Sequence, residues 1–211
     1  LDRVRPSPVP PLRRDDEHAA GPDGLRDDVA RLQSAITQEN NDLQSIRNQI
    51  MQSSSSYHTT VGAMSAKLQA STTPGNPQVV QQFNAAQASL DQVSSQLTRL
   101  NSLSTNVAAS ASQASFLQET IQATYALSGA VDEDHRQLGV LSLDLSRTAA
   151  VVDNLQNQVS QDISRQANYV ADERRNLNAL SQAVRTGHAI GGGLSSNQPP
   201  PGIGPASSSG S

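Results

Sequence analysis

The densest group of side chains that could bind a metal or transfer protons is the run Asp132-Glu133-Asp134-His135. Carboxylates and imidazole rings serve as metal ligands and as general acids and bases. Adjacent side chains on a helix point about 100° apart, however, so four consecutive residues cannot converge on one ion. We therefore expect this run to form a helix N-terminus, where acidic side chains are favourable, and we predict no metal site here.

The other residues that could do chemistry are scattered along the chain. His18, His58 and His188 form no pair at helical spacing. Ser128-Gly129 lacks the first glycine of a nucleophile elbow, and Gly191-Gly192-Gly193 neither follows a strand nor opens a helix, as a phosphate-binding loop does. We therefore predict that the protein is not an enzyme and has no catalytic residue, no cofactor and no metal ligand.

The composition points to shape more than to activity. Of the 211 residues, 35% are hydrophobic and only 2% aromatic, whereas globular domains average about 45–50% apolar residues. This disfavours an enzyme built around a single thick core. The net charge is −4 and Lys67 is the only lysine, so we expect no nucleic-acid partner. The chain has no cysteine, which excludes disulfides and thiolate metal sites.

The two ends differ from the middle of the chain. Residues 1–24 hold five of the eleven prolines, and residues 188–211 are rich in glycine, proline and serine. We predict a disordered lead-in over 1–24, a disordered tail over 188–211 and a helical region over 25–187.

The first helix is predicted from an apolar seam whose steps alternate between four and three residues. The phase shifts across the four serines of Ser53–Ser56, which we interpret as a stutter within one helix; a break there is the rival interpretation, because serine is a poor helix former. The seam comprises Leu25, Val29, Leu32, Ile36, Glu39, Leu43, Ile46 and Ile50, then Tyr57, Val61, Met64 and Leu68.

A turn is predicted near residues 72–76. Pro74 and Gly75 stop the preceding helix, Asn76 is a good N-cap, and Pro77 suits the first position of the next helix. The seam of that second helix is expected to keep its spacing throughout. Its members are Phe83, Ala86, Leu90, Val93, Leu97, Leu100, Ser104, Val107, Ala111, Ala114, Gln118, Ile121, Tyr125 and Ser128.

A second turn is predicted near residues 128–132, with Gly129 after the helix end and Asp132 as the next N-cap. The third helix should end just before Gly187, with Arg185 in its last turn, and should contain an eleven-residue repeat where Val159 steps to Ile163. Its seam comprises Leu138, Leu141, Leu145, Thr148, Val152, Leu155, Val159, Ile163, Gln166, Val170, Glu173, Leu177, Leu180 and Val184.

Polar residues inside these seams, Ser104, Gln118 and Gln166, are expected to set register or oligomeric state. The run Asp172-Glu173-Arg174-Arg175 is interpreted as a solvated face with pairing four residues apart.

Three helices of roughly 45–55 residues joined by short turns predict an all-α fold: an elongated antiparallel three-helix bundle or coiled coil. The alternative is a parallel coiled-coil oligomer in which one helix runs through Gly129. Either architecture buries the same seams. We expect self-association, or a protein partner, through these seams.

Part of the chain resembles the helical envelope region of certain uncharacterised bacterial proteins. In those proteins similar helices precede an outer-membrane-protein-A-like peptidoglycan-binding domain. The residues that carry the resemblance are Thr72–Pro77, Ser128–Leu138 and, more weakly, Tyr169–Arg174. The resemblance implies a cell-envelope or periplasmic protein whose helices act as a spacer or assembly element. After Gly187 the sequence continues as the Gly/Pro/Ser tail, so wall binding is not carried over.

We therefore expect a non-enzymatic structural or scaffolding protein of the bacterial cell envelope. The alternatives are a signalling coiled coil, which would place the chain in the cytoplasm, and a secreted filament or appendage subunit. No apolar run reaches the roughly 20 residues that a membrane span needs. Because the chain begins with Leu1, we expect it to be a processed chain or an excerpt, with any targeting segment or membrane anchor upstream.

Overall fold

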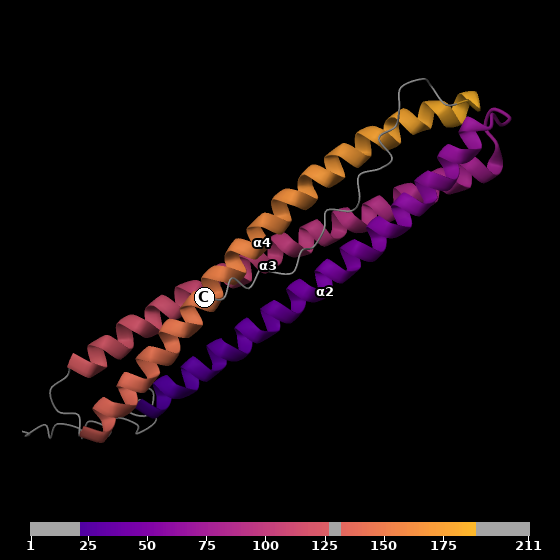
Figure 1. Ribbon diagram of the computed structural model, residues 1–211. Coiled ribbons are helices and arrows are strands. Elements are labelled where there is room, and N and C mark those ends of the chain that lie inside the picture. Colours follow the sequence, from indigo (N-terminus) through magenta and orange to yellow (C-terminus); the bar gives the residue numbers. More distant parts are fainter. Residues whose placement is uncertain (1–21, 127–131, 189–211) are drawn as a thin grey trace, which may run out of the picture. The chain divides into compact units, whose positions relative to one another are not determined.

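The computed structural model describes residues 22–126 and 132–188, and within these ranges the chain forms three helices and no strand. They are α2 (Pro22–Gln69), α3 (Pro77–Ala126) and α4 (Asp132–Thr186) (Figure 1). The predicted all-α fold is confirmed. The predicted lead-in ended at residue 24, but α2 already begins at Pro22, because proline suits the first position of a helix. The rest of the lead-in and the tail beyond His188 lie outside the described residues.

The described residues fall into two compact units, which we treat separately. The first unit contains residues 22–37 of α2, 109–126 of α3 and 132–153 of α4. The second unit contains residues 38–69 of α2, the turn at 70–76, residues 77–108 of α3 and 154–188 at the end of α4.

In the second unit α2 and α3 are antiparallel. Ser53 donates to Gln92 at 3.2 Å, and nearer the turn Lys67 donates to Gln78 at 2.9 Å. Residue numbers therefore rise along α2 while those of their partners fall along α3. The pairs between α2 and α4 keep a nearly constant offset in residue number instead, which places these two helices parallel. The predicted antiparallel three-helix bundle is confirmed here (Figure 1).

The predicted turn between α2 and α3 is also confirmed. Asn76 Oδ1 accepts the backbone N–H of Gln78 at 2.9 Å, as an N-cap should, and α3 begins at Pro77. The end of α4 closes onto this turn, because the backbone N–H of Thr72 donates to the carbonyl of Gly187 at 2.9 Å. Gly187 has a φ of +74°, the left-handed conformation that commonly follows a helix end.

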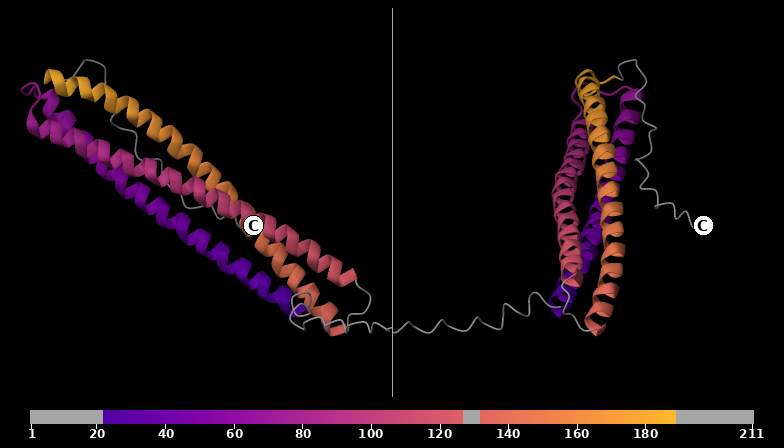
Figure 2. Two further views of the ribbon diagram at one scale, coloured as in Figure 1. Left: turned by 180° about the vertical axis from the view of Figure 1, so that it is seen from behind. Right: turned by 90° about the vertical axis from the view of Figure 1, so that its left-hand side faces the viewer.

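In the first unit the end of α3 and the start of α4 lie side by side, beside the start of α2 (Figure 2). The rings of Tyr125 and His135 meet edge to face with centroids 4.8 Å apart. Ten residues along one continuous helix would separate them by about 15 Å. Tyr125 and His135 therefore lie on two separate helices, α3 and α4, that pack against each other, and the alternative of a single helix through Gly129 is wrong. The turn at 128–132 itself lies almost wholly outside the described residues.

The seam of α2 is confirmed, and so is the stutter. Every predicted seam residue is buried, including the polar Glu39 at 8% exposure, and Ser54 joins them with no exposed surface. The steps from Ile46 to Ile50 and from Ile50 to Ser54 are both four residues, so the serine run shifts the phase of the helix and does not end it. The interpretation of a break there is wrong.

Of the predicted α3 seam up to Leu100, the structure buries Ala86, Leu90, Val93 and Leu100 and leaves Phe83 and Leu97 only half-buried. After Leu100 the seam departs further. The structure buries Leu103, Ser110 and Leu117 and leaves the predicted Ser104, Ala111 and Gln118 only half-buried. After Leu100 the buried steps run three then four where four then three was predicted, so Val107, Ala114 and Ile121 keep their predicted places and the residues between them shift by one position. At positions 103 and 117 the shift buries leucine, because burying leucine removes more apolar surface from water than burying the neighbouring Ser104 or Gln118. Tyr125, predicted in the seam, is 50% exposed, while Ser128 lies outside the described residues.

The seam of α4 is confirmed except at one position. The structure buries Asp162, with 2% exposure, in place of the predicted Ile163, so the four–three alternation continues past Val159. The extra residue comes later, between Glu173 and Leu177, after the adjacent pair Tyr169 and Val170 is buried. A carboxylate takes the place of isoleucine because its charge is paired, as described next.

Candidate functional site

A buried ion pair joins α2 to α4 in the second unit. Arg47 Nε donates to Asp162 Oδ2 at 2.6 Å, and Arg165 contacts the other carboxylate oxygen, Oδ1. The side chain of Asp162 is 3% exposed and that of Arg47 12%. A buried carboxylate is tolerated when it is paired and hydrogen-bonded, as it is here by two guanidinium groups. This contact ties two helices at one register.

An aromatic and polar layer lies further along the same two helices. The hydroxyl of Tyr57, whose side chain is fully buried, donates to the backbone carbonyl of Glu173 at 3.3 Å. Beside it, Tyr169 Oη and His58 Nε2 are 3.0 Å apart. The His58 ring also packs edge to face against Tyr57, with centroids 5.3 Å apart. The layer lies where the seams of α2 and α4 both shift phase.

Burial dominates the ionisation of these two tyrosines. It raises the pKa of Tyr57 above the range of ordinary phenols, and the nearby Glu173 carboxylate adds to the rise. Burial also raises the pKa of Tyr169 to about 12; the Ser54 hydroxyl opposes this rise and the Glu173 carboxylate adds to it. Both phenols therefore stay neutral well above their ordinary pKa, which suits a structural layer.

The first unit has its own polar contact between the same helices. Gln33 Nε2 donates to the hydroxyl of Thr148 at 3.2 Å, which in turn donates to the carbonyl of Asp144. The seam residue Thr148 is buried at 7% exposure. Of the polar seam residues expected to set register, Gln166 is buried at 3% exposure, while Ser104 and Gln118 lie at the edge of the core.

Two members of the cluster near the start of α4, Glu133 and His135, make pairwise contacts. Arg136 donates to both carboxylate oxygens of Glu133, at 2.8 and 2.6 Å, and Gln137 also donates to it. The Arg136 contact, followed by that of Gln137, lowers the pKa of Glu133. His135 turns to the Tyr125 ring. Across residues 22–126 and 132–188, no group of three or more His, Asp or Glu side chains is placed to bind a metal ion.

The charged run at 172–175 is only partly a solvated face. Asp172 and Arg175 are exposed and pair three residues apart, where a spacing of four was expected. Glu173 is buried instead and accepts a hydrogen bond from Asn176 at 3.1 Å. Arg174 reaches α3 and donates to Ser94 at 3.1 Å. Three of the four side chains, including that of Arg174, are therefore exposed as a solvated face requires, and only the buried Glu173 departs from the prediction.

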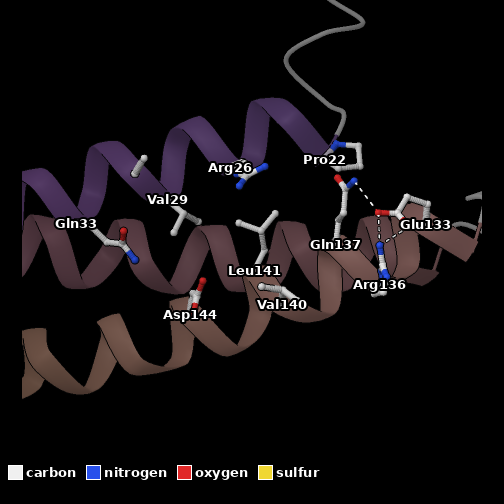
Figure 3. Close-up of a pocket in the computed structure, with 11 residues that line it drawn as sticks. Pro22, Arg26, Val29, Gln33, Glu133, Arg136, Gln137, Val140, Leu141 and Asp144 are labelled. Carbon is white, nitrogen blue, oxygen red and sulfur yellow. Dashed lines mark hydrogen bonds and ion pairs between the residues drawn. The ribbon is translucent and has the colours of Figure 1, made fainter.

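A groove opens between the start of α2 and the start of α4 in the first unit. Its volume is about 520 Å³. The buried Val29 and Leu141 line it, and Figure 3 shows both between the two helices, with the charged Arg26, Glu133, Arg136 and Asp144 around them. Apolar residues between charged rims favour the docking of an amphipathic segment.

The contacts that organise this protein were largely missed by sequence reasoning. Arg47 and Asp162 are 115 positions apart, so periodicity along one helix could not pair them. The available signal was that Asp162 continues the four–three alternation from Val159. His58 was noted in the sequence, but its contact with Tyr169 was not. His188 Nδ1 lies 2.9 Å from the carbonyl of Thr186, and His18 falls outside the described residues.

No protein-family model, no curated protein and no solved structure matches this chain. Within the parts of the chain that the structure describes, no helix is both long and apolar enough to cross a membrane.

Proposed function

We propose that this protein is a non-enzymatic structural protein of the bacterial cell envelope, whose helices act as a spacer or assembly element. The observation that carries the proposal is the buried contact of Arg47 with Asp162 between α2 and α4. The two charged groups of this contact hold α2 and α4 in one register. Buried charges of this kind are best attested as devices that fix register and specify one packing arrangement.

The continuity of α2 supports the spacer role. Its 48 residues give the helix a length of about 72 Å along its axis. It passes through the four serines without interruption, because Ser54 takes a seam position and Tyr57 resumes the apolar stripe. A stutter changes the local twist of a helix and leaves it continuous.

The envelope location rests on the resemblance carried by Thr72–Pro77 and Ser128–Leu138. Cell fractionation of the producing bacterium tests it with an antibody to the native protein. Recovery with periplasmic or envelope markers is expected. Recovery with cytoplasmic markers alone would contradict the location and favour the signalling alternative.

The spacer role is tested by a distance measurement along α2. The chain has no cysteine, so Ala35→Cys/Ala63→Cys gives two spin-label sites at exposed positions on either side of the serine run. A continuous helix places them about 42 Å apart. Pulsed electron paramagnetic resonance between the two spin labels should give one narrow distance distribution.

A matched pair on α3, Ala85→Cys/Gln113→Cys, has the same separation in sequence at exposed positions and contains no four-serine run. It should give a distribution of equal width. A distribution for α2 that is much broader or shorter than that of α3 would mean that α2 bends at the serines, and the spacer role would then be wrong.

A further inference from the structure

One face of α4 in the first unit carries apolar side chains that remain exposed among the residues that the structure describes. Val140, Leu143 and Val151 are 58%, 53% and 54% exposed. These are large fractions for aliphatic side chains, and the three residues lie within about three turns of one helix. Exposed apolar groups that gather on one face mark interaction surfaces more often than isolated ones do.

The charged residues between them complete a regular stripe. Asp144 and Arg147 lie between Val140 and Val151, so the four residues follow steps of four, three and four. Arg147 Nη1 is 3.4 Å from Asp144 Oδ1, and both side chains remain exposed, at 71% and 45%. The stripe Val140–Asp144–Arg147–Val151, named here the α4 stripe, therefore lies on one side of the helix and keeps its charges in water.

The order of residues in the α4 stripe is self-complementary when reversed. If a second α4 packs antiparallel about a point between Leu145 and Ser146, Val140 faces Val151 of the other copy and Asp144 faces Arg147. A parallel pairing in register would set Asp144 against Asp144 and Arg147 against Arg147. Like charges across a helix interface are unfavourable and opposite charges favourable, so charge selects the antiparallel arrangement.

The groove beside the stripe gives a second copy room to approach. Val140 and Asp144 line this groove of about 520 Å³, opposite Arg26 and Gln33 of α2 (Figure 3). A helix laid along the α4 stripe would therefore also lie near α2, as the added helix of a four-helix arrangement does.

We propose that the α4 stripe is a homodimer interface, in which α4 of a second copy packs antiparallel, Val140 against Val151 and Asp144 against Arg147. An isologous contact of this kind closes on itself and yields a dimer, not a filament. The inference rests on the proposed assembly role. Its test is the mass in solution, so it can fail while the rigidity of α2 and the envelope location hold.

The experiment measures the mass of the full chain by sedimentation equilibrium. The interface is small, so a monomer–dimer equilibrium is expected, with dimer present at about 100 µM. Asp144→Arg and Arg147→Asp should each give monomer only, because each variant carries two like charges in its stripe. An equimolar mixture of the two variants should regain the dimer mass, since every charge then faces its opposite on the partner.

The mixture separates a contact between chains from the contact of Asp144 with Arg147 within one chain, because neither variant regains its own internal pair on mixing. The matched control uses the exposed Asp172 and Arg175, which pair three residues apart on the same helix. Asp172→Arg and Arg175→Asp should leave the dimer mass unchanged, and circular dichroism confirms equal helix content in all variants.

Four results would overturn the proposal. The first is that the unaltered chain remains a monomer at every concentration. The second is that Asp144→Arg and Arg147→Asp each dimerise at the concentrations at which the unaltered chain does. The third is that the mixture of these two variants stays monomeric. Concentration-dependent fibres would also overturn it, because they require a contact that does not close, and they would favour the filament alternative.

Discussion

The carboxylate of Asp162 is held 2.6 Å from the guanidinium of Arg47, with both side chains almost withdrawn from water and 115 positions apart in the chain. The pair fixes the register between α2 and α4. Among the ion pairs of the described residues, neither Arg47 nor Asp162 has another charged partner on the opposite helix. Apolar seams alone could slide by one heptad and still bury leucine against leucine. A buried ion pair penalises every such slide.

Removing the carboxylate should therefore be costly. Asp162→Ala leaves Arg47 as a buried cation without its counter-ion, and we expect a loss of about 3 kcal/mol in the free energy of unfolding, measured in urea. The exposed Asp172 contacts Arg175 three residues further along the helix, as Asp162 contacts Arg165. Asp172→Ala should change stability by less than about 0.5 kcal/mol.

Replacing both Arg47 and Asp162 tests whether the ion pair is needed for stability or only fixes the register of the helices. Arg47→Met/Asp162→Leu fills the site with apolar groups, and it should recover most of the stability lost in Asp162→Ala. If Asp162→Ala itself were as stable as the unaltered chain, the ion pair would not contribute to the fold.

Substitution of Gly187 should also destabilise the protein. A Cβ at this position would lie 2.2 Å from the carbonyl oxygen of Thr72 and 2.9 Å from the nitrogen of Pro74, on a residue with a φ of +74°. Gly187→Ala therefore has to displace the turn between α2 and α3, and we expect a loss of more than about 1 kcal/mol in the urea experiment.

Two other glycines provide controls of opposite sign. Gly62 and Gly139 lie inside α2 and α4, and a Cβ added at either position would have no neighbouring atom within 4 Å. Gly62→Ala and Gly139→Ala should each raise the free energy of unfolding by up to about 1 kcal/mol, because alanine is the better helix former. A loss in all three variants would mean that the strain at Gly187 is not what the substitution probes.

The helices and the turn at Thr72–Pro77 could be predicted because each depends on local chemistry: an apolar repeat, a proline, a glycine and a capping asparagine. The register of the seams was harder. Leu103 and Ser104 both fit a helical face, and choosing Ser104 to preserve the spacing was wrong, because the packed helix follows the leucine.

Asp162 was missed for a different physical reason. Hydrophobicity favoured the neighbouring Ile163, and the guanidinium of Arg47 that makes burial of a carboxylate acceptable comes from another helix. The contact of Tyr57 with Glu173 is equally non-local. Periodicity identifies which face of a helix is buried. Which residues of two helices pair depends on how far one helix is displaced along the other, and that is known only from the structure.

The corrected register of α3 predicts different costs at adjacent positions. Leu117 is 2% exposed whereas Gln118 lies at the edge of the core. Leu117→Ala should lower the free energy of unfolding by about 3 kcal/mol, as expected for a fully buried leucine. Gln118→Ala should be close to neutral. The reverse order, with the glutamine the more costly site, would restore the register expected from uniform spacing.

The buried tyrosines predict a loss of stability at alkaline pH. Tyr169 has an ordinary pKa of 10.0 in the unfolded chain and about 12 in the folded protein, mainly because burial disfavours the phenolate. Above pH 10 the unfolded chain therefore releases this proton while the folded protein retains it, so stability falls as pH rises from 10 towards 12. Tyr57, whose pKa is also raised by burial, adds to the loss.

Urea midpoints measured across this pH range should decline steeply for the unaltered chain and less steeply for Tyr169→Phe. The half-exposed Tyr125 provides the control: Tyr125→Phe should retain the full decline, and an equal decline in both variants would show that burial of Tyr169 is not its cause.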